Sequence, residues 1–135
     1  MPRNEEAIVR MFNEYVQAFQ RLEPRSVATY CHLPCVFIAP QGVHMMTNVS
    51  EVESLLAAMM STLETRDYAR SEVTDMRVSR MSDSSAIVSV RRIRYRVDGS
   101  ELERLGETYT LRKVDGAWKI LTALVHDPGA IVGLA

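Results

Sequence analysis

The chain has 135 residues, 47% of them hydrophobic, with 16 basic residues against 17 acidic residues and a net charge of −1. This composition predicts one globular domain over residues 1–135 and excludes a disordered chain. The near-neutral charge argues against a nucleic-acid binder, and no apolar run approaches the ~18 residues of a membrane span. Because the N-terminal residues lack the apolar core of a signal peptide, we expect a cytoplasmic protein.

Apolar spacing and turn residues predict helices and short strands in the first half of the chain. In chain order, the predicted elements are a helix from Asn4 to about Arg21, a short helix from Pro24 to Pro34, strands over 35–38 and 42–46, and a third helix that begins at a capping-box pattern of Ser50 and Glu53. The first helix carries an apolar stripe that includes Tyr15 and Phe19. We expect these elements to cover one face of a sheet.

The last third of the chain predicts that sheet. A strand over residues 68–81 precedes two longer hairpins, whose loops are the pairs Asp98-Gly99 and Asp115-Gly116. Such pairs between β-branched and aromatic runs are typical of two-residue hairpin loops. Helices and short strands followed by long antiparallel strands indicate an α+β fold.

The two loops also define an expected register. Counting from them without a slip pairs Tyr109 with Thr122, Glu107 with Leu124, Leu105 with His126, Val88 with Tyr109 and Val90 with Glu107. This register places His126 and Glu107 on the same face. The apolar pattern changes face after Val90, which we interpret as a β-bulge near Arg91 and Arg92, with a twisted hairpin arm as the alternative.

The order of elements, together with the stretch VDGAWKI at residues 114–120, resembles the nuclear transport factor 2-like superfamily. The stretches EYVQAF at 14–19 and APQG at 39–42 support the resemblance, which covers nearly the whole chain. It implies a cone in which a curved antiparallel sheet wraps around three helices and leaves a mostly apolar pocket. It also implies a homodimer through the outer face of the sheet.

Ketosteroid isomerases, polyketide cyclases of the SnoaL type and scytalone dehydratases belong to this superfamily. In the isomerases a first-helix tyrosine donates to the oxyanion, and Tyr15 matches that position. Their general base is a carboxylate just before the turn that follows the second helix, where this chain has Ala39. Without that base, steroid isomerisation is not expected.

Two classes of function follow from the resemblance. The first is a domain that binds a small hydrophobic organic ligand in the cone, with acid/base chemistry of the isomerase, cyclase or dehydratase kind. The second is a non-catalytic dimerisation or protein-association module whose pocket is filled. No cofactor is expected for either class.

His126 is the first candidate for acid/base chemistry, because a histidine can exchange a proton near neutral pH. Adjacent strand residues point to opposite faces, so Glu107 is its expected partner rather than Asp127. The predicted catalytic set is therefore His126, Glu107 and Tyr15. The alternative is that His126 and Asp127 only end the sheet before Pro128.

Glu107 is expected on the inner face beside Val90 and Tyr109. A carboxylate in such apolar surroundings is costly unless it is paired, so Glu107 is predicted to be functional or salt-bridged, with Arg92 as the nearest candidate partner. The alternative is a register slip that turns Glu107 outward into water.

Several aromatic and polar residues are candidates for lining a ligand cavity. The predicted ligand-binding residues are Phe19, Tyr30, His32, His44, Tyr109 and Asp127. Tyrosine and histidine side chains in a cavity suit a flat, partly polar ligand. The alternative is that the tyrosines are core residues whose hydroxyl groups bond to water or backbone.

Cys31 and Cys35, with His32 and His44, contain only half of a typical zinc pattern. We therefore expect no metal site and two reduced thiols, since a cytoplasmic location disfavours a disulfide.

The arginine-rich stretch over residues 91–96 resembles a nucleic-acid patch, but Arg94 is expected to face Glu103 and Arg96 to face Glu101. Because these cross-strand pairs neutralise the stretch, we predict that it lies on the outer face of the sheet and binds no nucleic acid.

Overall fold

Three helices and six strands make up the computed structural model, which describes residues 5–131. Their bounds are α1 Glu5–Gln20, α2 Pro24–Ala28, β1 Cys31–Ala39, β2 Gly42–Met46, α3 Val49–Thr65, β3 Tyr68–Arg80, β4 Ser85–Arg96, β5 Glu101–Val114 and β6 Ala117–His126. The predicted start of α1, Asn4, lies outside the described residues.

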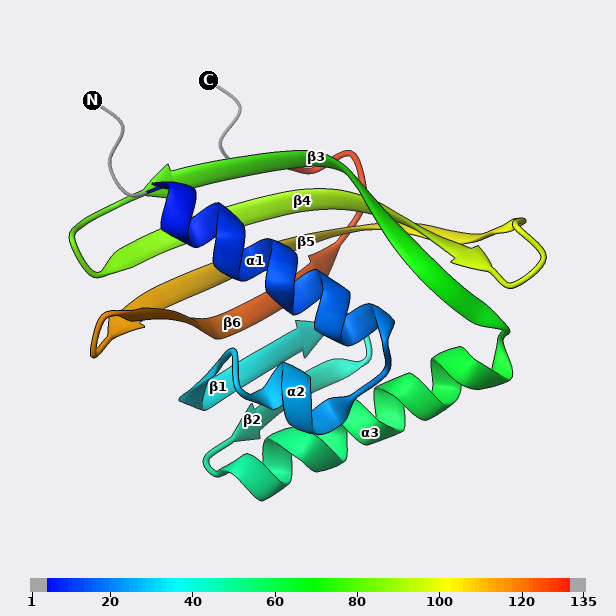
Figure 1. The fold of residues 1–135 in the computed structure, drawn as a ribbon, viewed down its shortest axis with the longest axis horizontal. Coiled ribbons are helices and arrows are strands. Elements are labelled where there is room, and N and C mark those ends of the chain that lie inside the picture. The colour runs from blue at the N-terminus through cyan, green and yellow to red at the C-terminus, as the bar shows by residue number, and fades with distance from the viewer. Residues whose placement is uncertain (1–4, 132–135) are drawn as a thin grey trace.

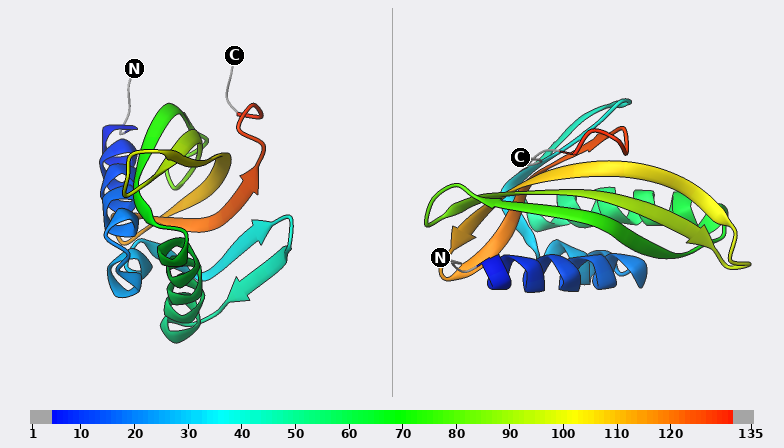
Figure 2. Two further views of the ribbon diagram at one scale, coloured as in Figure 1. Left: turned by 90° about the vertical axis from the view of Figure 1, so that its right-hand side faces the viewer. Right: turned by 90° about the horizontal axis from the view of Figure 1, so that it is seen from above.

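The six strands form one curved sheet in the order β2-β1-β6-β5-β4-β3. All neighbouring strands are antiparallel except β1 and β6, which pair in parallel. The long helices α1 and α3 lie on the concave side of the sheet (Figures 1 and 2). The turn after β6 lies on the opposite side (Figure 2). The predicted α+β cone is therefore confirmed.

The apolar stripe of α1 faces the sheet as its spacing predicts. Its buried residues include Phe12, Tyr15 and Phe19, each less than a tenth exposed. The rings of Phe12 and Tyr109 pack edge to face, with their centroids 5.0 Å apart. This contact joins α1 to β5 in the middle of the sheet.

The start of α3 differs from the prediction. The Asn48 side chain accepts a hydrogen bond from the backbone N–H of Glu51 at 2.9 Å, and the Glu51 carboxylate accepts from the backbone N–H of Thr47 at 2.7 Å. This is the reciprocal arrangement of a capping box, two residues earlier than the predicted pair of Ser50 and Glu53. Both pairs have the same spacing, and the asparagine occupies the cap.

The predicted end of α2 at Pro34 is also wrong, because α2 ends at Ala28 and Pro34 lies inside β1. Proline cannot donate to a strand ladder, so it is tolerated only where the ladder is interrupted. The pairing of β1 with β6 is irregular between Cys31 and Val36, and Pro34 falls in that interval. Because β1 begins at Cys31, both cysteines belong to this strand.

The register of β4 and β5 agrees with the prediction at the centre of the sheet. Val88 pairs with Tyr109, and Val90 pairs with Glu107. The predicted bulge lies in the neighbouring strand: Val73 pairs with Arg92 and Asp75 with Arg91, so that Thr74 is the extra residue of β3. β4 itself continues without a slip, so Arg92 keeps the inward orientation of Val88 and Val90.

The two predicted pairs of arginine and glutamate have different outcomes. Arg94 faces Glu103 as predicted, with its Nη1 2.6 Å from a carboxylate oxygen. The pairing of Arg96 with Glu101 is wrong, because the register shifts after Arg94. Arg96 instead donates to the backbone carbonyl of Glu101 at 2.8 Å.

The register of β5 and β6 departs from the prediction a few residues from the hairpin loop. Leu111 pairs with Ile120 as expected, but Thr110 pairs with Thr122, which leaves Leu121 as an extra residue in β6. Every later pair is displaced by one residue. The observed pairs are Tyr109 with Ala123, Glu107 with Val125 and Gly106 with His126. A displacement by one residue reverses the face of each side chain that follows.

Candidate functional site

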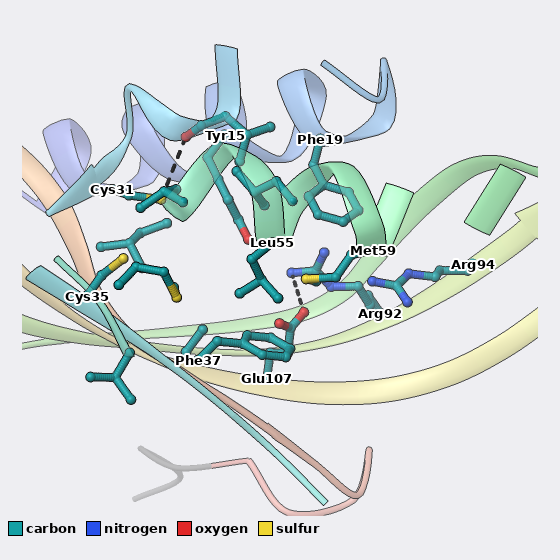
Figure 3. Close-up of a pocket in the computed structure, with 17 residues that line it drawn as sticks. Tyr15, Phe19, Cys31, Cys35, Phe37, Leu55, Met59, Arg92, Arg94 and Glu107 are labelled. Carbon is teal, nitrogen blue, oxygen red and sulfur yellow. Dashed lines mark hydrogen bonds and ion pairs between the residues drawn. The ribbon is translucent and has the colours of Figure 1, made fainter. Parts of the chain in front are cut away.

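The helices and the concave face of the sheet enclose a cavity of about 60 Å³ (Figure 3). Most of its wall is apolar. The residues that line it are Tyr15, Phe19, Val27, Cys31, Cys35, Val36, Phe37, Met46, Val52, Leu55, Leu56, Met59, Arg92, Arg94, Glu107, Ile120 and Ala123. At ~30 Å³ for each water molecule, a space of this size holds about two.

A wider surface hollow of about 450 Å³ adjoins this cavity between α3 and the sheet. The two spaces share the lining residues Phe37, Leu55, Met59, Arg94 and Glu107. Small-molecule sites in proteins usually measure about 300–1,000 Å³. The inner cavity is below that range, whereas the cavity and the hollow together fall within it.

A buried polar network forms the sheet side of the inner cavity. Arg92 is 1% exposed, and its Nη2 lies 3.2 Å from an oxygen of Glu107, which is 5% exposed. The same Nη2 donates to the hydroxyl of Tyr109 at 2.7 Å, and this hydroxyl lies 3.4 Å from that of Tyr15. Glu107 therefore faces inward and is salt-bridged to Arg92, as one of the two alternatives predicts.

Both tyrosines and the arginine of this network keep their protons near neutral pH. Burial raises the pKa of Tyr15, and the charge of Glu107 raises it further. Burial also raises the pKa of Tyr109, although Arg92 opposes the shift. Burial alone would lower the pKa of Arg92, but Tyr109 and Glu107 beside it raise that pKa overall. Both tyrosines therefore remain hydrogen-bond donors, and Arg92 remains charged.

The order of the hydroxyl groups gives Tyr15 a role in the cavity. Because Arg92 donates to Tyr109, the Tyr109 proton can be directed to the oxygen of Tyr15. The proton of Tyr15 is then free for an acceptor in the cavity, toward which this side chain points in Figure 3. An uncharged acceptor such as a carbonyl oxygen fits this arrangement.

Arg94 lies where the cavity meets the outer hollow. Its Nη1 pairs with Glu103 at 2.6 Å, and the second oxygen of Glu103 lies 3.3 Å from Nη1 of Arg66. The guanidinium carbon of Arg94 is 5.7 Å from the centre of the Phe19 ring. Among the residues that the structure describes, the buried Nε atoms of Arg92 and Arg94 have no hydrogen-bond partner.

The predicted pair of His126 and Glu107 does not exist. The Leu121 bulge turns His126 to the outer face of the sheet, whereas Glu107 lies on the inner face. On the outer face, Nε2 of His126 is 2.7 Å from the hydroxyl of Thr108, and Nδ1–H donates to the carbonyl of Asp127 at 2.8 Å. A methyl group at Gly106 would lie 2.5 Å from Cε1 of this ring, so the ring needs a glycine beneath it.

The other predicted ligand-binding residues are divided between the cavity and the surface. Phe19 lines the cavity, His44 lines the outer hollow, and Tyr109 belongs to the buried network. Tyr30 lines a separate surface hollow beside Trp118.

His32 and the exposed Asp127 also lie outside the cavity. His32 accepts from Nη1 of Arg112 at 3.0 Å, so its Nδ1–H is the group that donates to the carbonyl of Pro34 at 3.0 Å. Both nitrogens of this ring are therefore engaged by other residues of the protein. The interpretation as ligand-binding residues has no structural support for Tyr30, His32 and Asp127.

Arg92 and Arg94 belong to the arginine-rich stretch that was expected on the outer face, but both lie on the inner face, where Arg92 was also the candidate partner of Glu107. The sequence contains a signal for this orientation, because both arginines share the alternation of the buried residues Val88 and Val90. The prediction gave more weight to the charge of these arginines than to the alternation of the strand that carries them. The apolar contributions of α3, Leu55 and Met59, follow from its helical spacing.

The two thiols also line the cavity. Cys31 donates to the carbonyl of Val27 at 3.8 Å. Its hydrogen bond with Cys35 and its burial raise the pKa of Cys31, so this thiol stays protonated. Within residues 5–131, no three His, Cys, Asp or Glu side chains are grouped as metal ligands. In the same part of the chain, none of the helices has the length and apolar character needed to span a bilayer.

A curved sheet with helices on its concave side and a mostly apolar cavity defines a nuclear transport factor 2-like protein. The sequence model of the family described as "NTF2-like protein (DUF6841)" matches residues 4–128, and the chain belongs to this family. A search of curated proteins found no match.

Solved structures share the fold at low sequence identity. An NTF2-like protein of unknown function from Shewanella oneidensis is 16% identical with a TM-score of 0.74, covering 93% of this chain and 100% of that chain. An NTF2-like protein from Novosphingobium aromaticivorans is 11% identical with a TM-score of 0.76, covering 94% and 83%. A ketosteroid isomerase-like protein from Erwinia carotovora is 14% identical with a TM-score of 0.69, covering 99% and 100%. At these identities the likeness shows the fold alone.

Proposed function

We propose that this protein binds a small, largely apolar organic molecule in the cone, which enters through the hollow beside α3. The observation that carries the proposal is the network of Tyr15, Tyr109, Arg92 and Glu107 at one side of an otherwise apolar cavity. An ion pair buried for stability alone gains little over apolar side chains of similar size. A few convergent polar groups in an apolar cavity are typical of ligand sites.

The same network supports acid/base chemistry on the bound molecule. Tyr15 would donate a hydrogen bond to a carbonyl oxygen, and Glu107 is the carboxylate that lines the inner cavity among the described residues. His126 has no part in this proposal, because it lies on the outer face. The reaction class would be proton transfer next to a carbonyl, as in isomerisation or dehydration.

A homodimer through the outer face of the sheet remains part of the proposal. The exposed side chain of Leu124 and the hydroxyl pair of Thr110 and Thr122, 2.8 Å apart, lie on that face. Native mass spectrometry is expected to give twice the 15.3 kDa mass of one chain. The mass of a single chain would contradict the dimer.

Blocking the cavity tests the ligand proposal. Met59 lines both the cavity and the hollow, so Met59→Trp is expected to fill the passage between them. Met45→Trp is the matched control, because Met45 is 68% exposed and lines neither space. In ligand-observed NMR with a library of small aromatic and alicyclic compounds, wild type and Met45→Trp should bind compounds that Met59→Trp does not.

Equal binding by the Met59→Trp variant would place the compounds elsewhere on the protein. No binding by any of the three proteins would instead favour the non-catalytic association module.

A further inference from the structure

We infer that the molecule bound in the cone is a small organic monoanion, with an apolar body and one carboxylate group that contacts Arg94. The inference rests on the proposed function and adds the chemical class of the ligand. It follows from the charges of the lining residues, from the way these charges are paired, and from the apolar groups around them.

The charges that line the cavity and the hollow do not balance. Three guanidinium groups, those of Arg66, Arg92 and Arg94, face two carboxylates, those of Glu103 and Glu107. One positive charge is therefore in excess. Uncompensated charge in a partly buried site attracts a counter-charge, and a single carboxylate would neutralise it.

The pairing locates the excess at the junction of the two spaces. Arg92 and Glu107 form a one-to-one pair at the sheet side of the inner cavity. Glu103 is shared by Arg94 and Arg66, at 2.6 Å and 3.3 Å, so that two guanidinium groups have one carboxylate between them. Arg66 is half exposed and reaches water, whereas the Arg94 side chain is 12% exposed. Arg94 is thus the arginine whose charge is incompletely neutralised and whose side chain has little contact with water.

Arg94 also has a hydrogen-bond donor that is not used within the described residues. Its Nη1 is the group that bonds to Glu103, while its buried Nε has no hydrogen-bond partner among the described residues. A buried donor without a partner costs free energy that a ligand acceptor would recover. A carboxylate suits a guanidinium group because two parallel N–H donors can meet its two oxygens.

The apolar neighbours define the remainder of the ligand. Phe19 packs beside the Arg94 guanidinium, and Leu55 and Met59 of α3 border both spaces. Figure 3 shows Arg92 and Arg94 at the same end of the cavity as Phe19 and Met59. A ligand with its carboxylate at Arg94 would place its apolar body against these side chains. A second carboxylate would be left without a cationic partner.

The test compares acids with their uncharged amides. Isothermal titration calorimetry would measure the affinity of benzoate, phenylacetate and cyclohexanecarboxylate, each against the amide of the same shape. Wild type is expected to bind at least one acid about tenfold more tightly than its amide, since a hydrogen bond to a charged group contributes at least that ratio. Added salt should weaken the binding of the acid and not that of the amide.

Arg94→Gln is expected to reduce the preference for the acid to about twofold or less, and Arg94→Lys to retain part of it. Arg104→Gln is the matched control, because Arg104 lies on the neighbouring strand β5 and also makes an ion pair, to Glu101 at 2.8 Å, but lines neither space. This control should keep the full preference. Thermal unfolding of each variant establishes that it is folded.

Two results would overturn the inference. Equal affinity for acid and amide in wild type would exclude recognition of the charge, while leaving a cone that binds small molecules. Acid binding that survives Arg94→Gln unchanged would place the carboxylate elsewhere. If none of these acids or amides binds, the inference fails, and the compound library with Met59→Trp decides separately whether the cone binds any small molecule.

Discussion

Replacing Arg92 by leucine is expected to lower the free energy of unfolding by about 3–5 kcal/mol, because it leaves the buried carboxylate of Glu107 without its cation. The change also removes the donor to the Tyr109 hydroxyl. Urea denaturation at neutral pH, followed by circular dichroism, measures the loss. The double variant Arg92→Leu/Glu107→Leu should recover most of it, since neither charge then remains buried.

Arg91→Leu is the matched control for this prediction. Arg91 is the preceding residue of β4, and it pairs with Asp75 at 3.0 Å with 37% of its side chain exposed. Arg91 is partly exposed and also donates to the carbonyl of Pro128 at 2.8 Å, so its removal is expected to cost about 1 kcal/mol. If Arg92→Leu cost no more than Arg91→Leu, the ion pair of Arg92 and Glu107 would have to be accessible to water.

Alkaline pH is expected to destabilise the fold steeply above about pH 10. Unfolded tyrosines lose their protons near pH 10, whereas burial raises the pKa of Tyr15 and Tyr109 in the folded protein. The unfolded state then binds fewer protons than the folded state, so the free energy of unfolding falls as pH rises. Each tyrosine contributes about 1.4 kcal/mol per pH unit, and the two together contribute about 2.8 kcal/mol per pH unit.

Urea denaturation between about pH 9 and about pH 11 measures this slope. Tyr15→Phe and Tyr109→Phe should each reduce it by about half, because each removes one of the two proton-binding groups. A slope that is the same in wild type and in the double variant Tyr15→Phe/Tyr109→Phe would show that other groups cause the loss of stability at alkaline pH.

The fold could be predicted because its signals are local. The apolar spacing of α1 and the Asp-Gly loops of the last third specify a helix and hairpins within short windows. These elements leave few ways to bury their apolar faces, and the curved sheet with helices on one side follows. The capping box was misplaced by two residues because Asn48 and Ser50 are each followed three residues later by a glutamate.

The site could be predicted only in part, because the face of each strand residue depends on uninterrupted counting. Tyr15 lies on a helix, and Glu107 lies on β5, which has no extra residue where it pairs with β6, so both were placed correctly in the cavity. His126 lies beyond Leu121 and was placed on the wrong face. Nothing in the residues of β6 marks the extra residue, because Leu121 is apolar like its neighbours and carries no Gly or Pro signal.

Leu121 also bears on how such a protein can change over generations. Deleting this one residue would leave the five positions after it on their present faces, because it has no register partner in β5. Loss of the bulge with Leu121 retained would instead displace those positions by one residue and carry them to the opposite side of the sheet. The imidazole that now rests over Gly106 would then point toward Glu107, and the alanine methyl group of the cavity wall would give way to the threonine hydroxyl. A lineage with this fold can therefore exchange the chemistry of its cavity through substitutions that straighten one strand, with the length of the chain unchanged.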